Sequence, residues 1–406
     1  MIILVLNSGS SSLKFQVINT SSEHLLIKGI VDGIGLPTCK FDYEYENKNV
    51  YKNMGGYEKD TNCYEKNSNQ VTCPDHNEAV SIVLKTISET VGLDKIQAIG
   101  HRVVHGGEFY KEATLIDDDV IKKIDELKDL APLHNPPNLA GILACKKLLP
   151  TLKQVAVFDT AFHESMPEHA YLYAIPYEYY EKFKIRKYGF HGTSHKYVSI
   201  QAKKFLNMEK CNLVTCHLGN GSSITAIQDG ISIDTSMGFT PLQGILMGTR
   251  SGNIDPEIIV FLSKKLGKTD SEILSILNKQ SGLKGICGFS DVRTIHEKAL
   301  AGDKKCILAL DILSYKLGKH IGSYMVVLPN VDAIVFTAGI GENAYYIRQR
   351  ACDELVNFGV LIDKKKNEEN KEIDISAPNS KVKILVIHTN EELMIAKETE
   401  ELLKDH

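Results

Sequence analysis

Hydrophobic and polar positions follow strand and helix periods from the first residues onward. Apolar Ile2–Leu6, a polar turn at residues 7–12 and the partly alternating segment Leu13–Ile18 together predict a β-hairpin. The apolar residues of Asn77–Val91 recur close to the helical period, and this predicted helix leads into a buried strand at Ile96–Ile99. A β–α–β order therefore begins here.

The rest of the chain continues this alternation. Helices are predicted at Asp117–Leu130, Asn138–Leu148, His195–Leu206, Pro256–Leu266, Asp270–Lys279, Ser290–Ala301, Cys306–Met325 and Ala344–Leu355. Strands are predicted at Gln154–Phe158, Asn212–His217, Ser223–Ile227, Ile231–Ile233, Ala333–Thr337 and Val382–Ile387. Helices that alternate with apolar strands indicate an α/β fold.

Two segments about half a chain apart are alike. Residues 6–11 (LNSGSS) and 218–223 (LGNGSS) each follow an apolar strand and lead through a small polar turn into a second strand. Neither turn opens a helix, so neither is a Walker loop or a dinucleotide-binding glycine motif. The repeat predicts a duplicated domain with a cleft between the halves.

We place the first domain at residues 1–150, completed by a C-terminal helix at 391–406, and the second at 151–390. Asn, Lys, Glu and Tyr dominate residues 39–75, and few aliphatic residues occur there. We therefore expect this segment to be an exposed, strand-containing insertion with little catalytic content.

Composition supports two domains and small partners. The 406 residues, 43% hydrophobic and 24% charged, exceed the roughly 250–300 residues at which one core stops growing. A formal charge of -4 gives no case for a nucleic-acid partner. The apolar stretches are too short for a membrane span, and no secretory leader is expected. Nine scattered cysteines without a CxxC motif suit a reducing, cytoplasmic location.

Three clusters of small residues are candidates for phosphate binding. Gly9 to Ser12 would let backbone N–H groups approach an anion, and Lys14 would point to the same face of the second strand. Segment 217–223 has the same character, and segment 339–343 lies between a buried strand and a helix. Each cluster alone is equally an ordinary tight turn, and only the three together favour a nucleotide.

Two arginines and one aspartate stand where anion chemistry is expected. Arg102 follows a buried strand in HRVVHGG, and Arg250 lies between two glycines in MGTRSGNIDPE. A surface salt bridge is the alternative for each arginine. Asp159 ends a strand between aromatic residues, and it is either a carboxylate with tuned ionisation, a metal ligand or only a helix cap.

His191 and His195 in YGFHGTSH have the spacing of neighbours on one helical turn. A zinc pair is one interpretation, but no HExxH motif accompanies them, so we favour a hydrogen-bond donor to substrate. Glu391 and Glu392 open the last helix, as capping acids do, and their oxygens also suit magnesium near phosphates.

The motifs cover nearly the whole chain in order: NSGSSSLKF, HRVVHGG, PLHNPPN, FDTAFH, YGFHGTSH, HLGNGSS, MGTRSGNIDP, Asp291-Val292-Arg293, GIGEN and TNEELMIA. Together they resemble the acetate kinase family, within the ATPase superfamily of actin, heat-shock chaperones and sugar kinases. The resemblance implies two duplicated actin-like (ribonuclease H-like) domains with an interdomain nucleotide cleft, and a homodimer. It also implies reversible, Mg²⁺-dependent phosphoryl transfer from ATP to acetate, giving acetyl phosphate and ADP.

The same resemblance implies roles for individual residues. Mg²⁺, with Mn²⁺ as a substitute, would be held by Asn7 and Glu391, and the phosphates would lie beside Ser10, Ser12 and Lys14. The catalytic residues would be Arg102, Asp159, His191 and Arg250. The acetate site would comprise Arg102, Val104, Leu133, His134, Phe190 and Pro241. The ATP contacts would be His217, Leu218, Gly219, Asn220, Gly221, Asp291, Val292, Arg293, Gly339, Ile340, Gly341, Glu342 and Asn343.

The chemistry of the implied reaction agrees with these residues. Two anions must meet, so positioned cations should carry the catalysis. Acetate is already ionised at pH 7, with a carboxyl pKa near ~4, so Asp159 should orient a group and not accept a proton. Two alternatives stay open: a propionate or other short-chain acyl kinase, and an actin-like or chaperone-like ATPase without a small acceptor. The choice between ATP and GTP is also left open.

Overall fold

The computed structural model describes residues 1–46 and 64–404 of the chain. These residues form two compact units, each described here by itself. Met1–Ala161 and Asn390–His406 make up the first unit, and Phe162–Thr389 makes up the second.

The first unit extends beyond residue 150, where we placed the domain boundary. The reason is that strand β8 (Lys153–Phe158) pairs with β6 (Ala98–Val103) in the sheet of the first unit. Within the described part of the chain, no helix combines the length and the apolar character that crossing a bilayer requires.

An eight-stranded sheet in the order β5-β4-β3-β2-β1-β6-β8-β7 forms the centre of the first unit. Its other strands are β1 (Ile2–Ser8), β2 (Ser12–Asn19), β3 (His24–Asp32), β4 (Cys39–Glu46), β5 (Tyr64–Val71) and β7 (Thr114–Leu115). β1 runs antiparallel to β2 and parallel to β6, and β6 runs parallel to β8. Helices cover both faces of these central strands, which explains their continuous apolar sequences.

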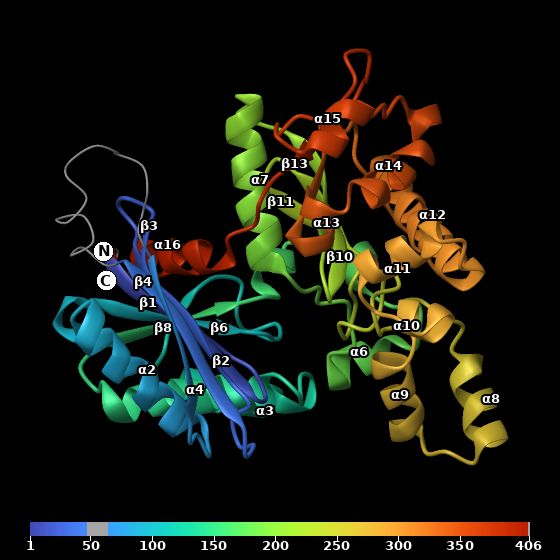
Figure 1. Ribbon diagram of the computed structural model, residues 1–406. Helices are drawn as coiled ribbons and strands as arrows, with labels where there is room; N and C mark the ends of the chain where they lie inside the picture. Colours follow the sequence, from blue (N-terminus) through green and yellow to red (C-terminus); the bar gives the residue numbers. More distant parts are fainter. Residues whose placement is uncertain (47–63, 405–406) are drawn as a thin grey trace. The chain divides into compact units, whose positions relative to one another are not determined.

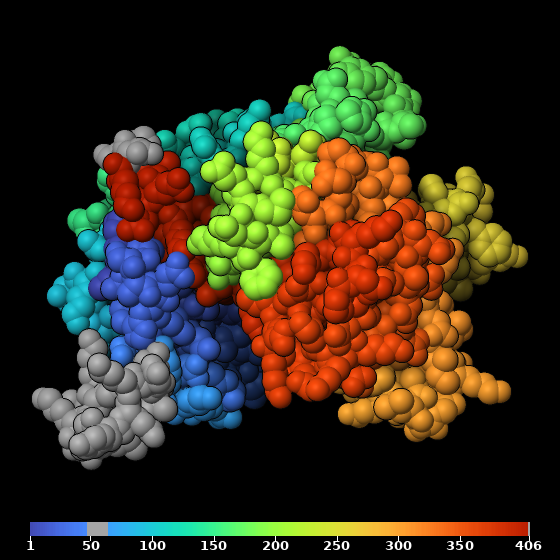
Figure 2. Space-filling model, turned by 90° about the horizontal axis from the view of Figure 1, so that it is seen from above, coloured from blue at the N-terminus to red at the C-terminus, as the bar shows by residue number. Residues whose placement is uncertain are grey.

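Helices α2 (His76–Thr90) and α4 (Asn135–Leu148) cover one face of this sheet, and α16 (Glu391–Lys404) covers the other (Figure 1). α16 comes from the far end of the chain, and Figure 2 shows it in red directly beside the blue N-terminal strands. Gly100 on β6 allows this packing, because a Cβ there would lie 2.6 Å from Thr399 Oγ1. The remaining elements of the unit are η1 (Leu93–Lys95), α3 (Asp118–Glu126) and η2 (Leu127–Asp129).

The second unit contains a five-stranded sheet in the order β11-β10-β9-β12-β13. Its strands are β9 (Asn212–Leu218), β10 (Ser222–Gln228), β11 (Ile231–Thr235), β12 (Ala333–Thr337) and β13 (Lys383–Val386). α7 (Gly192–Leu206) packs on β9 and β12, and α12 (Lys304–Val327) packs on β9 and β10. The two helices bury separate apolar clusters on the sheet.

Shorter helices complete the second unit and link its strands. They are α5 (Glu168–Tyr171), α6 (Tyr177–Phe183), α8 (Glu257–Leu266), α9 (Asp270–Lys279), α10 (Gly282–Cys287), α11 (Val292–Leu300), α13 (Ala338–Asn343), α14 (Tyr345–Asp353), η4 (Val356–Phe358) and α15 (Lys364–Glu369). The short η3 (Ala161–His163) spans the boundary between the units.

The two sheets repeat one topology. β3-β2-β1-β6-β8 in the first unit corresponds to β11-β10-β9-β12-β13 in the second. In each set a hairpin is followed by two parallel strands, and the first strand of the hairpin lies in the middle. This repeat confirms the duplicated α/β fold that the two LNSGSS-like turns predict.

The prediction for residues 39–75 needs a correction. β4 and β5 continue the main sheet, and Cys39, Phe41 and Cys73 are buried in its core. Cys39 and Phe41 of β4 are buried, and Tyr43 and Tyr45 are partly buried against the same core, so a polar average composition concealed a strand with one apolar face. The part of this prediction that falls on residues 47–63 lies outside the described residues.

Candidate functional site

Three polar side chains of the first unit meet where adjacent parallel strands end. Asn7 lies near the end of β1, Arg102 near the end of β6, and Asp159 directly after β8. Arg102 donates from Nε to Asp159 Oδ1 at 2.9 Å and from Nη2 to Oδ2 at 2.6 Å. Its Nη1 donates to Asn7 Oδ1 at 3.4 Å. Parallel sheets of α/β proteins bind ligands at this edge.

Arg102 and Asp159 form a bidentate, largely buried ion pair. Asp159 is buried, whereas 22% of the Arg102 side chain is exposed. Burial opposes the charge of Arg102, but the ion pair with Asp159 outweighs it and raises the pKa of the guanidinium. Both carboxylate oxygens of Asp159 accept hydrogen bonds from Arg102, so the aspartate fixes the orientation of the guanidinium.

The β1–β2 turn places an ammonium beside this cluster. Lys14 is the register partner of Asn7, so both side chains lie on the same face of the hairpin. A 2.7 Å hydrogen bond from Gly9 N to the Ser12 carbonyl oxygen closes the turn, in which Ser10 is exposed. Small residues, hydroxyls and backbone N–H groups next to a lysine form a suitable environment for an anion.

α16 begins at this cluster with Glu391 and Glu392. Burial raises the pKa of Glu391, although the charge of Arg102 partly opposes the shift. Burial and the neighbouring Glu391 raise the pKa of Glu392. A divalent cation would offset the unfavourable ionisation of these carboxyls, and the Asn7 amide oxygen adds a further hard donor. The residues present therefore fit a divalent metal.

Two buried asparagines of α4 hold the strand ends in place. Asn138 donates to the Ser8 carbonyl oxygen at 2.6 Å and accepts from Val104 N at 3.0 Å. Asn135 donates to the His105 carbonyl oxygen at 3.0 Å and accepts from His105 N at 3.1 Å. Sequence reasoning found the PLHNPPN motif but missed these roles. The available signal was a pair of asparagines spaced three residues apart on a helix that packs on a sheet.

The predicted acetate contacts of the first unit surround this end of α4. Val104 is buried directly after β6, and His134 is the N-cap residue of α4. Leu133 is 65% exposed on the surface of the unit. Val104, two residues after Arg102, is bonded to Asn138 of α4, and His134 begins the same helix. Leu133 lies on the exposed surface just before it.

His191 is fixed at the start of α7 in the second unit. The helix begins at Gly192 and not at His195 as expected, because His191 itself takes the N-cap position. His191 has left-handed backbone geometry with φ 59°, a strained conformation that is common at ligand sites. Its ring stacks on His217 with 4.1 Å between centroids, and its Nδ1 lies 2.9 Å from Ser223 Oγ.

A buried row of hydrogen bonds lies behind His191. Ser223 Oγ is 2.7 Å from His195 Nε2, and His195 Nδ1 is 2.7 Å from Thr215 Oγ1. Burial, reinforced by the charges of His163 and His217, lowers the pKa of His195 well below its usual value. Both ring nitrogens of His195 bind hydroxyls, which removes it as a zinc ligand. The one hydroxyl proton of Ser223 can be donated to only one imidazole, so the row couples the tautomers of His191 and His195.

Gly221 allows His191 and Arg250 to approach each other. A Cβ at Gly221 would lie 3.1 Å from the His191 ring and 3.5 Å from Arg250 Nη1. Arg250 donates from Nη1 to the Pro241 carbonyl oxygen at 3.1 Å, and burial lowers the pKa of Arg250. Phe190 is buried next to His191 in the chain. The predicted residues 190, 191, 221, 241 and 250 therefore belong to one region of the second unit.

A cavity of about 480 Å³ in the second unit joins the three segments expected to contact ATP. The lining residues that were predicted as ATP contacts are Gly219, Asn220, Asp291, Val292, Arg293, Gly339, Ile340 and Asn343. Leu218 is buried in the core, so its side chain faces away from a ligand. Grouping three separate segments around one hollow is the arrangement that a nucleotide site requires.

Ser290 and Tyr346 also line this cavity, and sequence reasoning missed both. Tyr346 stacks on His296 at 3.6 Å between centroids and donates from its hydroxyl to the Val292 carbonyl oxygen at 3.2 Å. The ring is thereby held as a flat apolar wall. An aromatic pair three residues after GIGE was the available signal.

The glycine segment 339–343 does not form the expected turn between β12 and a helix. It is itself the short helix α13, which starts at the end of β12. The Glu342 carboxylate accepts hydrogen bonds from Ala338 N at 2.8 Å and from Thr389 N at 3.1 Å. Buried Arg348 donates to the carbonyl oxygens of Gly341 and Glu342 at 2.9 Å each. Glu342 and Arg348 therefore shape this wall of the cavity.

Two similar α/β units, each with charged groups and small-residue turns at its strand ends, define a protein with the duplicated actin-like fold. The sequence model of the acetokinase family matches residues 2–397. The chain belongs to this family.

Similar proteins match over their full lengths. The acetate kinase of Carboxydothermus hydrogenoformans is 51% identical over 99% of this chain and 99% of its own. The acetate kinase of Thermotoga maritima is 50% identical over 100% of this chain and 99% of its own.

Two solved structures share the fold closely. A propionate kinase from Francisella tularensis subsp. tularensis SCHU S4 has a TM-score of 0.91 at 47% identity, covering 98% of each chain. An acetate kinase from Porphyromonas gingivalis has a TM-score of 0.91 at 40% identity, covering 99% of each chain.

Proposed function

We propose that this protein catalyses the reversible, Mg²⁺-dependent transfer of a phosphoryl group from ATP to acetate, giving acetyl phosphate and ADP. The observation that carries the proposal is Arg102, held by both oxygens of Asp159 at the end of three strands, beside Asn7, Lys14 and Glu391. Full-length similarity to two proteins named acetate kinase supports the choice of acceptor.

The reaction brings a carboxylate to a phosphate, so repulsion between anions is the main barrier that the protein must lower. Arg102 from the first unit and Arg250 from the second would bind the acetate carboxylate and the phosphoryl group as it transfers. His191 would donate a hydrogen bond to the phosphoryl oxygens. Asp159 would hold Arg102 in position, and no proton need leave acetate because it is already ionised.

Asn7 and Glu391 are the residues that would hold the metal, and Ser10, Ser12 and Lys14 would lie beside the phosphates. Magnesium fits this set best because its ligands are hard oxygens, and manganese shares that preference. When bound, the metal would neutralise phosphate charge.

The cavity formed by the 219–220, 290–293 and 339–346 segments would hold the nucleotide, with Tyr346 as an apolar wall for the base. His217 and Gly221 would flank the phosphates. Val104, Leu133, His134, Phe190 and Pro241 would surround the acetyl group. A donor other than ATP would be accepted only if its base fits the same wall.

We also propose a homodimer located in the cytoplasm. All residues of α8 are described and none of them is buried, although Val260, Phe261 and Leu266 are large and apolar. Such a patch is typical of a surface that a partner covers. The eight described cysteines are free thiols, which is compatible with a reducing compartment.

A hydroxylamine assay tests the function directly. Purified protein with Mg²⁺ and ATP should form a hydroxylamine-reactive acyl phosphate only when acetate is present. ADP release at the same rate without acetate would instead identify an ATPase without a small acceptor, and the proposal would be abandoned.

Propionate is the second candidate acceptor, because a propionate kinase is 47% identical to this chain. The ratio of kcat/KM for acetate over propionate decides between them. We expect a ratio above one and no greater than about 200, because a single methylene changes kcat/KM by roughly 10–200-fold. A ratio below one would reassign the substrate.

A further inference from the structure

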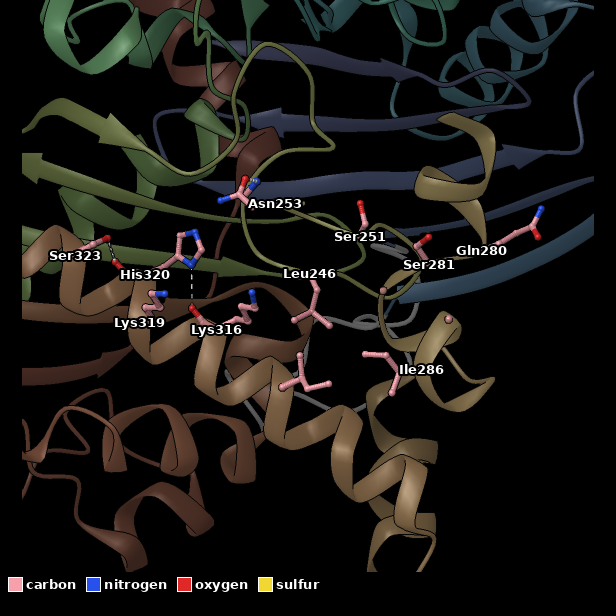
Figure 3. Close-up of a pocket in the computed structure, with 14 residues that line it drawn as sticks. Leu246, Ser251, Asn253, Gln280, Ser281, Ile286, Lys316, Lys319, His320 and Ser323 are labelled. Atoms are coloured by element: carbon pink, nitrogen blue, oxygen red, sulfur yellow. Dashed lines mark hydrogen bonds between the residues drawn. The ribbon is translucent and has the colours of Figure 1, made fainter. Parts of the chain in front are cut away.

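The second unit contains another cavity, which shares no lining residue with the nucleotide cavity. Its volume is about 700 Å³, and it lies between α12 and the loop segments around residues 244–253 and 280–286 (Figure 3). Neither the proposed reaction nor the acetokinase motifs assign a ligand to it. The volume is in the range of sites for small organic molecules.

The charge around this cavity has one sign. Lys316, Lys319 and His320 lie on the side of α12 toward the cavity (Figure 3), at a spacing that places them on one helix face. Within the described parts of the chain, neither lysine ammonium has an ion-pair partner, and no aspartate or glutamate lines the cavity. Two cations without a counter-charge favour an anionic ligand.

Other polar groups and an apolar floor add further recognition. His320 donates from Nδ1 to the Lys316 carbonyl oxygen at 2.9 Å, so Nε2 of the neutral ring is an acceptor for a hydroxyl group of a ligand. Asn253 Oδ1 accepts from Gly244 N at 3.0 Å, which leaves its amide N–H groups for an acceptor. Leu246 and Ile286 lie between the polar walls (Figure 3). The site would thus suit oxyanion groups attached to a short carbon skeleton.

The cavity wall also includes Ser251, the residue that follows Arg250, and Gly282, which packs against the Arg250 backbone. A Cβ at Gly282 would lie 2.6 Å from the Arg250 carbonyl oxygen and 3.1 Å from Arg250 N. Ser251 N donates to the Leu277 carbonyl oxygen at 3.0 Å. A ligand in the cavity would therefore press on the segment that positions Arg250.

We propose that this cavity is a regulatory site for a small organic polyanion, a molecule with two or more carboxylate or phosphate groups. Bound there, the ligand changes the position of Arg250. The effect on Arg250 rests on the proposed function, because Arg250 is assigned there to the phosphoryl group. Binding of the polyanion does not depend on that assignment.

Binding is tested by calorimetry on the full chain without acetate or nucleotide. The probes are 3-phosphoglycerate, which carries a phosphate and a carboxylate, and tricarballylate, which carries carboxylates only. Glycerol serves as the uncharged probe. The Lys316→Gln/Lys319→Gln variant removes both cations, and Lys304→Gln/Lys305→Gln removes two exposed lysines of the same helix outside the cavity.

At least one charged probe should bind the wild type and the Lys304/Lys305 control equally. It should bind the Lys316/Lys319 variant about tenfold or more weakly, because a hydrogen bond to a charged group is worth roughly that factor. Equal affinity in all three proteins, or no binding by either charged probe at millimolar concentration, would overturn the site.

Regulation is tested separately by kinetics. A saturating probe should change KM for acetate or kcat at least about twofold in the wild type and the control, and leave the Lys316/Lys319 variant unchanged. Binding without any kinetic change would refute the regulatory role and retain the site. If the wild type without any probe shows no acetate-dependent activity, the proposed function is refuted. The calorimetric result on binding would still stand.

Discussion

The residues of the site are held in position by interactions of very different strength. Arg102 is held by a bidentate ion pair with Asp159, whereas the contacts of Arg250 are a carbonyl oxygen and a methionine sulfur. His191 depends on one hydroxyl, that of Ser223, for the orientation of its Nδ1. The hydroxyl is therefore the point at which the orientation of His191 can be tested.

Ser223→Ala should lower kcat for acyl phosphate formation about tenfold or more, with a smaller change in KM, because it frees the tautomer of a group that acts in the transition state. The matched control is Ser199→Ala, since Ser199 is also buried but donates only to the Lys196 carbonyl oxygen. Nitrogen-15 spectra of the histidine rings should show a changed His191 tautomer in the first variant alone. Unchanged spectra and kcat would contradict the role of Ser223.

At the scale of elements, the ends of β1 and β6 are joined through α4. Asn138 bonds the backbone of both strand ends, and Gly141 admits close packing because a Cβ there would lie 2.2 Å from Ser8 Oγ. Asn7 directly precedes Ser8, so the position of a proposed metal ligand depends on this helix.

Asn138→Ala should lower the free energy of unfolding by about 2–4 kcal/mol, because it leaves a buried N–H and a buried carbonyl without partners. Asn69→Ala, at an exposed position of β5, should change it by less than about 0.5 kcal/mol. Urea denaturation of the two variants measures the difference. Equal stabilities would show that the asparagine does not support the strand ends.

The turns around the nucleotide cavity should respond as a group. ADP should slow hydrogen exchange in the segments around Gly221, residues 290–293 and Gly341, because these segments would contact the ligand. α8 lies outside the cavity lining and serves as the internal reference. Unchanged exchange at all three segments would remove the cavity as the nucleotide site.

At the scale of the whole molecule, each unit buries a histidine that must stay neutral. Burial lowers the pKa of His101 in the first unit and of His163 in the second from 6.5 to about 4. Because the unfolded chain binds these protons more readily, their contribution to stability is full above pH 6.5 and is lost as the pH falls toward 4. Each histidine changes the free energy of unfolding by roughly 3 kcal/mol over this pH interval.

The acid sensitivity can be measured from denaturation midpoints between pH 7 and pH 4.5. Stability should fall steadily on acidification, and His101→Gln, which keeps a polar side chain opposite Gln154, should show a shallower slope. The same slope in the variant and the wild type would contradict a neutral buried His101.

Much of the fold could be predicted because its central strands are apolar runs bounded by small-residue turns. The two hairpins and the strands at 154–158, 212–217 and 333–337 followed from pattern alone. The helical state of segment 339–343 did not, because its glycines suggest a turn, and Arg348 holds the helix through carbonyl contacts from the next helix.

Residues that act through tertiary contacts were the least predictable part of the site. Arg102 and Asp159 stand out in the sequence, but their pairing depends on β6 and β8 being adjacent strands in the observed register. The local signals of Asn135, Asn138 and Tyr346, a pair of asparagines three residues apart and an aromatic pair after GIGE, do not by themselves reveal the tertiary contacts that these residues make. The burial of β4 depends on α2 and on the rest of the sheet, so the composition of residues 39–75 could not show it.

The proposed reaction requires both Arg102 and Arg250 to stabilise the transferring phosphoryl group. The measurement is kcat/KM for acetate in Arg102→Ala and Arg250→Ala. The control with the same charge change is Arg350→Ala, a partly exposed arginine paired with Asp311. We expect kcat/KM to fall about 10²–10³-fold in each site variant, the scale of removing one preorganised donor, and to change little in the control. Values within about tenfold of wild type for both site variants would contradict this requirement.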